Sequence, residues 1–241
     1  TAGTERIARA AFEFAKANGK SRVSIVTKAY IMKKTDGKEQ KSMEHINVTD
    51  CETALNRLMA GNKEYLIAKE GKGDISEEIR ILTHEYGQKP YAIVIACSDS
   101  RVIPEKIFMV GIGEIFTIRV AGNVIGDFEL GSIEYAAGHL GVKLIMVMGH
   151  SRCGAVDAAI HNAGHDSILH ITDEINKAIG TDTDPVCCEK KNILHSMERI
   201  KKSPLLQTSI KDGSLKIVGA YYHTRSGKVE LLNIPSSRSL L

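Results

Sequence analysis

Two short runs of the sequence combine thiol, imidazole and carboxylate side chains at close spacing. Residues 97–101 read Cys-Ser-Asp-Ser-Arg, and residues 149–154 read Gly-His-Ser-Arg-Cys-Gly. Zinc prefers thiolate and imidazole ligands in tetrahedral geometry, and three protein ligands with one open position are typical of a catalytic site. Cys97, His150 and Cys153 could supply such a set. The pattern predicts a metal site, although by itself it does not select zinc over other soft-ligand metals.

Each of these runs directly follows a continuous apolar stretch. The sequence has four such stretches, at residues 91–96, 115–120, 144–148 and 215–221. Amphipathic segments at 130–140 and 154–163 lie between them. Strands that are apolar on both faces and alternate with helices indicate a parallel sheet covered on both sides. Because sites in such sheets lie at the carboxyl ends of the strands, we expect both runs at the same edge.

We therefore predict an α/β fold with a mostly parallel four-stranded sheet, an added edge strand near residues 229–232, and helices on both faces. Two helices are predicted before the sheet as an N-terminal helical arm. The second covers residues 75–86, and the first would be interrupted or ended by Gly61. The apolar face of that first helix consists of Ala54, Leu55, Leu58 and Met59.

The composition favours a soluble, cytoplasmic protein. The 241 residues fit one domain of generous size, or one domain with an appendage. The 32 basic and 29 acidic residues give a net charge of +3, which demands neither a nucleic acid nor a membrane partner. The apolar runs are too short to span a bilayer, and the first residues show no secretory signal. Five cysteines at irregular spacing do not form a disulfide framework.

Taken together, the two runs resemble the paired signatures of the β-class carbonic anhydrases. The resemblance extends over about residues 43–235 and includes segments 119–123, 132–136 and 218–222. It implies the reversible hydration of CO2 to bicarbonate and a proton by zinc-bound hydroxide, with one Zn²⁺ per chain. Position by position, the resemblance implies that Cys97, His150 and Cys153 are the zinc ligands. It also implies that Asp99 and Arg101 form a dyad beside the metal.

The same resemblance assigns four residues to the substrate pocket. Gln88, Phe116 and Tyr135 match positions that line this pocket in the plant-type branch, and Gly122 matches a backbone position close to the metal. Gln88 could donate to a bicarbonate oxygen, and Phe116 could supply a dry wall for apolar CO2. Ordinary core packing explains Phe116 and Tyr135 equally well.

The resemblance also implies a homodimer or a higher homo-oligomer, with the helices around residues 45–85 wrapping the partner. Two other functions remain compatible with the motifs. A zinc hydrolase acting on carbon disulfide would keep every ligand, and a catalytically silent module that binds bicarbonate or zinc would keep the fold. Parallel assays of both substrates, together with metal content, separate these possibilities.

Residues 1–38 resemble a different family. They are similar to a helix–strand segment of NAD-dependent isocitrate and isopropylmalate dehydrogenases, with a predicted helix at 4–18 and strand at 22–32. Lys28 matches a lysine that works in catalysis there, but Tyr30 replaces the expected asparagine. The metal-binding aspartates and nucleotide site of those enzymes have no counterpart. We interpret residues 1–40 as an appended segment without its own activity, and residues 43–241 as the carbonic anhydrase-like zinc domain.

The remaining cysteines and histidines carry simpler interpretations. Cys187 and Cys188 lie in a polar stretch after Pro185, where loop or partly buried thiols are expected. We interpret the other histidines as mostly surface or hydrogen-bonded residues, namely His139, His161, His165, His170, His195 and His223.

The ligand set itself predicts a pH dependence. Two thiolates cancel the formal charge of a zinc ion, whereas three neutral histidines leave it at +2, so bound hydroxide is stabilised less. We expect CO2 hydration to rise with pH through an apparent value above about 7 and to be slow in mild acid. Measuring kcat/KM from acid to alkaline pH checks this. A profile already flat and maximal at about pH 6, below the reference value for a three-histidine site, would contradict the charge argument.

Overall fold

The computed structural model describes residues 50–233, all within the second of the two units into which the chain divides, Ile46–Leu241. The strands are β1 (Ala92–Ala96), β2 (Ile115–Arg119), β3 (Leu144–His150), β4 (Lys216–Tyr222) and β5 (Val229–Leu231). The helices are α4 (Cys51–Tyr65), α5 (Glu77–Tyr86), α6 (Pro104–Ile107), α7 (Asp127–Gly138), α8 (Gly154–Ile160), α9 (Leu169–Ile179), α10 (Pro185–Lys201) and α11 (Pro204–Lys211), with short 3-10 turns η1 (Ala121–Asn123) and η2 (Asp166–Ile168).

The helix and strand predicted at 4–18 and 22–32 lie outside the described residues. The dehydrogenase resemblance of residues 1–38 and the domain boundary near residue 40 therefore stay predictions. Among residues 50–233, no helix combines the length and the apolar character needed to cross a membrane.

The sheet confirms the predicted topology. Its five strands follow the order β2-β1-β3-β4-β5; β1 to β4 are parallel, and β5 pairs antiparallel with β4. In the register of β1 and β3, Ala96 lies opposite Met148. The residues that follow β1 therefore reach the same edge of the sheet as the end of β3.

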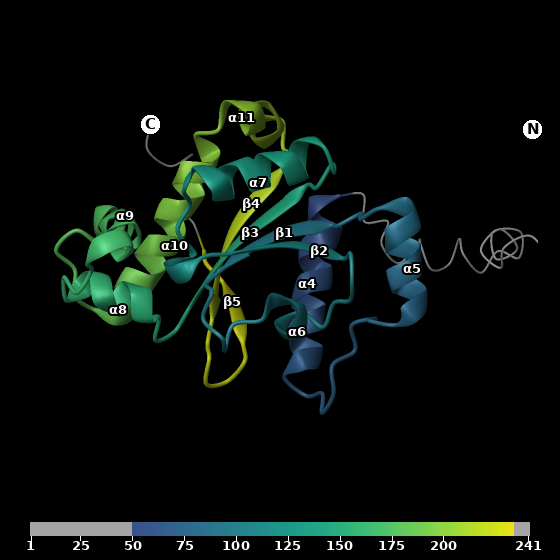
Figure 1. Cartoon of the computed structure of the whole chain (residues 1–241), viewed down its shortest axis with the longest axis horizontal. Helices are drawn as coiled ribbons and strands as arrows, with labels where there is room; N and C mark the ends of the chain where they lie inside the picture. Colours follow the sequence, from purple (N-terminus) through teal and green to yellow (C-terminus); the bar gives the residue numbers. More distant parts are fainter. Residues whose placement is uncertain (1–49, 234–241) are drawn as a thin grey trace, which may run out of the picture. The chain divides into compact units, whose positions relative to one another are not determined.

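Helices lie on both faces of the sheet (Figure 1). Alternating side chains along the strands build a core on each face. Val94 and Ala96 face α4 and α6, where they pack with Leu58 and Phe108. Their neighbours on the same strand face α7, α10 and α11. Because strands buried on both faces lack a polar side, this arrangement explains why their sequences read as continuous apolar runs.

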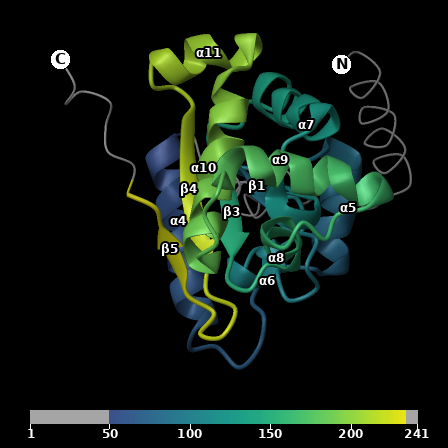
Figure 2. The same cartoon turned by 90° about the vertical axis from the view of Figure 1, so that its left-hand side faces the viewer.

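A third, smaller core lies beyond the carboxyl edge of the sheet. There α8 and α9 lie beside the end of β3 (Figure 2), and Val156 and Ile175 pack around Cys97 and Cys153. This core keeps Cys97 and Cys153 away from bulk water.

The prediction that Gly61 interrupts or ends the first helix is wrong. Helix α4 continues through Gly61 to Tyr65. A Cβ atom at Gly61 would lie 1.9 Å from the carbonyl oxygen of Phe108. The glycine is therefore explained by the close approach of another backbone rather than by a helix end.

Of the two expectations for Cys187 and Cys188, the loop is wrong, whereas a partly buried thiol is confirmed for Cys187. Both residues lie in α10, which begins with Pro185 at its first position. The side chain of Asp184 caps this helix by accepting the N–H of Cys187 at 2.7 Å. Aspartate followed by proline is a helix-start signal. Cys188 is buried and Cys187 is half-buried.

Replacing Gly61 with alanine should destabilise the domain. Helix propensity alone would favour alanine by up to about 1 kcal/mol, but the clash with Phe108 should dominate and cost about 1–3 kcal/mol. Urea unfolding measures the difference. The matched control is Gly131→Ala in α7, where a Cβ meets nothing within 4 Å. Equal stability of the two variants would contradict the close-approach explanation.

Candidate metal centre

Three buried side chains converge at the carboxyl edge of the sheet. Cys97 follows β1, His150 ends β3, and Cys153 is the N-cap of α8. One ligand atom of each residue lies within 4.8 Å of the others. Neighbouring parallel strands thus bring together residues that are far apart in the sequence.

The ring of His150 is oriented so that one nitrogen faces this cluster without a protein partner. Nδ1 lies 3.1 Å from the carbonyl oxygen of Ser151. A carbonyl oxygen can only accept, so Nδ1 carries the proton and Nε2 presents a lone pair. Nε2 is buried and has no hydrogen-bond partner within residues 50–233. A metal ion would satisfy this atom, and such a carbonyl contact commonly orients a ligating histidine.

Backbone N–H groups point at the sulfur of Cys97. The amides of Asp99 and Gly122 donate to Sγ at 3.4 and 3.3 Å. A hydrogen bond from Cys153, supported by contacts from His150 and these amides, lowers the pKa of the Cys97 thiol to about 4. The same pairing raises the pKa of the Cys153 thiol. The two amides that donate to Sγ thus stabilise a thiolate at Cys97.

The close approach of Gly122 depends on its being glycine. Its φ is +71°, and a Cβ there would lie 2.9 Å from Cδ1 of Ile175. The short turn η1 can then bring this amide onto the sulfur of Cys97.

The donor set fits zinc. Two sulfur atoms and one imidazole nitrogen match the preference of Zn²⁺, whereas Mg²⁺ and Ca²⁺ require oxygen ligands. Three protein donors leave room for a fourth, exchangeable ligand, as in catalytic zinc sites.

Asp99 and Arg101 form a bidentate ion pair beside this cluster. Nε and Nη2 of Arg101 donate to the two carboxylate oxygens of Asp99 at 2.9 and 2.7 Å. These bonds hold the pKa of the Asp99 carboxyl well below its usual range. The carboxylate also lies 4.0 Å from Nε2 of His150. An ionised acceptor is thus fixed next to the ligand atoms.

Two arginines also tie the loops of the site together. Arg101 Nη2 donates to the carbonyl oxygen of Arg152 at 3.0 Å, which links the two signature runs. Arg119, at the end of β2, donates to the carbonyl oxygens of Cys97 and Asp99 at 3.1 and 2.8 Å. The sequence places Arg119 at a strand end beside the first run, but it does not reveal these backbone contacts.

Comparison with known proteins identifies the family. A sequence model of the carbonic anhydrase family matches residues 92–229. The chain belongs to the β-carbonic anhydrase family. It is a zinc-dependent carbonic anhydrase, which hydrates CO2 reversibly to bicarbonate and a proton.

Three known proteins show how far the similarity of this chain to the family extends. Carbonic anhydrase 2 of Mycobacterium tuberculosis is 38% identical over 157 residues, which cover 60% of this chain and 75% of that protein. The solved β-carbonic anhydrase CafA of Aspergillus fumigatus has a TM-score of 0.59 at 27% identity, covering 65% of this chain and 82% of that one. A tetrameric β-carbonic anhydrase of Sordaria macrospora has a TM-score of 0.58 at 22% identity, covering 76% and 95% respectively, and this likeness concerns the fold.

Within one chain of this carbonic anhydrase, Gly122 contacts the ligand Cys97 as predicted, whereas the other three predicted pocket residues lie apart from the ligands. Phe116 is opposite Ile93, four residues before Cys97, or about 13 Å along the strand. Tyr135 contacts Phe116 at 6.4 Å between ring centroids. Gln88 is exposed and precedes the amino end of β1, whereas Cys97 follows the carboxyl end.

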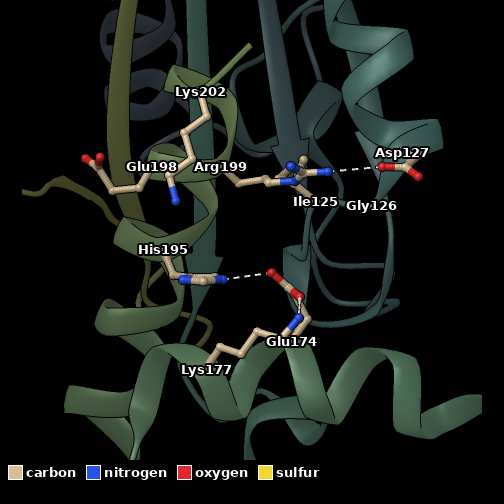
Figure 3. Close-up of a pocket in the computed structure, with 9 residues that line it drawn as sticks. All are labelled: Ile125, Gly126, Asp127, Glu174, Lys177, His195, Glu198, Arg199 and Lys202. Carbon is tan, nitrogen blue, oxygen red and sulfur yellow. Dashed lines mark hydrogen bonds and ion pairs between the residues drawn. The ribbon is translucent and has the colours of Figure 1, made fainter.

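A separate cavity of about 460 Å³ opens between α9, α10 and the start of α7 (Figure 3). Its charged side chains largely pair with one another. Glu174 binds Lys177 at 2.6 Å and His195 at 2.7 Å, and Arg199 binds Asp127 at 3.0 Å. No residue of the predicted site lines this cavity, and His195 is a hydrogen-bonded histidine as predicted.

Proposed function

We propose that this carbonic anhydrase hydrates CO2 at a zinc centre formed by Cys97, His150 and Cys153, with Asp99 and Arg101 orienting the attacking water. The observation that carries the assignment is the buried, unpartnered Nε2 of His150, which faces two thiols within 4.8 Å. Leaving such an atom buried without a partner costs about 1–3 kcal/mol, and a bound cation removes that cost. Stopped-flow CO2 hydration combined with metal analysis tests the proposal.

The chain's own groups supply orientation. Zinc, when bound, supplies a Lewis acid that makes water a usable nucleophile near neutral pH. Asp99 accepts a hydrogen bond from the attacking water and thereby aims its lone pair at the carbon of CO2. Because Arg101 keeps this carboxylate ionised and occupies both of its oxygens, Asp99 stays beside the centre as an acceptor.

We also propose that a second copy of the chain completes the substrate pocket. Strand β2 lies at one edge of the described sheet and is only half-buried, although parallel sheets are normally covered on both faces. Helix α7 beside it exposes 91% of Phe128 and 47% of Tyr135. An aromatic surface of this kind suits an interface. In a two-fold dimer, Gln88, Phe116 and Tyr135 of one protomer would line the site of the other.

Removing either thiol ligand should remove the metal. Cys97→Ala or Cys153→Ala should lose zinc and activity together, because two remaining ligands hold the ion poorly. Metal content per chain after dialysis measures this. Cys187→Ala in α10 is the control and should keep one zinc per chain. Full zinc occupancy in either ligand variant would refute the assignment.

Changing the dyad should separate activity from metal binding. Asp99→Asn should keep zinc but lower kcat/KM on the order of 100-fold, because an amide can donate where the carboxylate only accepts. Arg101→Ala should act in the same direction by releasing the carboxylate. Metal content and stopped-flow rates are measured on the same preparations. Near-normal turnover in both variants would make the pair merely structural, and loss of zinc in both would make Asp99 an obligatory ligand.

Subunit complementation tests the shared pocket. Cys97→Ala and Gln88→Ala chains should each be poorly active alone. After subunit exchange, a hybrid dimer has one site with intact ligands from one chain and Gln88 from the other. A 1:1 mixture should therefore regain about a quarter of the parent activity per chain. If subunit exchange is confirmed but no activity returns, the shared pocket is contradicted. Gln88 then either acts in the site of its own chain or does not belong to the site.

A further inference from the structure

Glu189 is a buried carboxyl group that the proposed chemistry does not use. It lies on α10, and only 3% of the residue is exposed. Its two oxygens accept hydrogen bonds from the backbone N–H of Cys153 at 3.0 Å and from the hydroxyl of Tyr221 at 2.5 Å. Burying a carboxyl group is costly unless its oxygens accept hydrogen bonds, so both of these hydrogen bonds contribute to stability.

The contact to Cys153 controls a single peptide group. The carbonyl oxygen of Arg152 and the N–H of Cys153 belong to the same peptide unit. Arg101 donates to that oxygen at 3.0 Å, while Glu189 accepts from that N–H. The side chains of Arg101 and Glu189 therefore hold this peptide plane from both sides.

The backbone needs this restraint. Arg152 has a φ of +58°, which is the left-handed region and costs a non-glycine residue free energy. Cys153 is the N-cap of α8, so its N–H has no acceptor within that helix. Rotation of this peptide would change the direction of the Cα–Cβ bond of Cys153, and hence the position of its sulfur.

We propose that Glu189 is a positioning residue of the metal centre: it fixes the Arg152–Cys153 peptide and so directs the sulfur of Cys153 toward the ion. This inference rests on the assignment of Cys153 as a ligand. A carboxyl group suits the role because both of its neighbours are donors. Glu189→Leu would remove both acceptor oxygens, whereas a glutamine could still accept the N–H of Cys153 while donating to the hydroxyl of Tyr221.

The test is Glu189→Leu with two readouts besides activity. The first is zinc affinity, measured by competition with a chromogenic chelator at fixed pH. We expect it to weaken at least about 10-fold, since loss of such supporting contacts typically costs 10–100-fold. The second is the absorption spectrum of the Co²⁺-substituted protein, whose thiolate-to-metal charge-transfer band should shift or lose intensity.

A matched control separates positioning from general stability. Ser203→Ala removes another buried hydrogen bond to a carboxyl group, that of Ser203 to Glu134 at 2.6 Å. It should lower stability to urea while leaving zinc affinity and the Co²⁺ band unchanged. Zinc affinity of Glu189→Leu within about twofold of the parent, with an unchanged band, would overturn the proposal.

Two further variants keep the outcome interpretable. If Glu189→Leu does not fold, Tyr221→Phe should change both readouts in the same direction by a smaller factor, because it releases one oxygen of the Glu189 carboxyl group. Unchanged values would again overturn the role of Glu189. Cys153→Ala tests the underlying assignment. If it binds zinc as tightly as the parent, the ligand assignment fails, whereas weak binding there with normal binding in the Glu189 variant refutes only Glu189.

Discussion

The parallel pairing of β1 with β3 is the constraint on which the metal centre depends. It places the residue after β1 level with the end of β3, so that Cys97 and His150 share one edge of the sheet. A shift of one residue along either strand would turn its side chains to the opposite face. The register is fixed by burial on both faces, because Val94 packs toward α4 while Ile95 packs toward α7 and α10. The same strand register therefore sets both the packing of the apolar core and the position of the ligands.

Around this edge, hydrogen bonds from several side chains and amides fix the ligands and the loops that carry them. Amide N–H groups point at the sulfur of Cys97, and Arg101 neutralises Asp99. Arg119 holds the carbonyl groups of the first signature run, and Glu189 holds the peptide before the last ligand. Most of these contacts are to backbone atoms. The geometry of the loops, rather than that of the ligands alone, sets how well the centre is preorganised.

Much of this arrangement can be predicted from the sequence, because it follows from local pattern. Apolar runs give the strands, alternation with helices gives the parallel sheet, and the rule for strand ends places both signature runs at one edge. Gly61 shows where such reasoning fails. A glycine reads locally as a helix end, but here it permits contact with the backbone of Phe108, which only the folded chain reveals.

The supporting residues escape prediction for the same reason. Glu189 sits in a polar stretch with no motif of its own, and its role appears only where α10 crosses the loop before α8. The pocket residues illustrate a different limit. Gln88 and Cys97 lie at opposite ends of β1. A sequence motif can identify both residues, but it does not show whether they reach one site from the same chain or from two chains.

Zinc K-edge X-ray absorption of the purified protein tests the central claim most directly. The account predicts two sulfur neighbours at about 2.3 Å, one imidazole nitrogen at about 2.0 Å, and one further light-atom ligand. A spectrum without sulfur, or with four sulfur neighbours, would contradict a centre built from Cys97, His150 and Cys153.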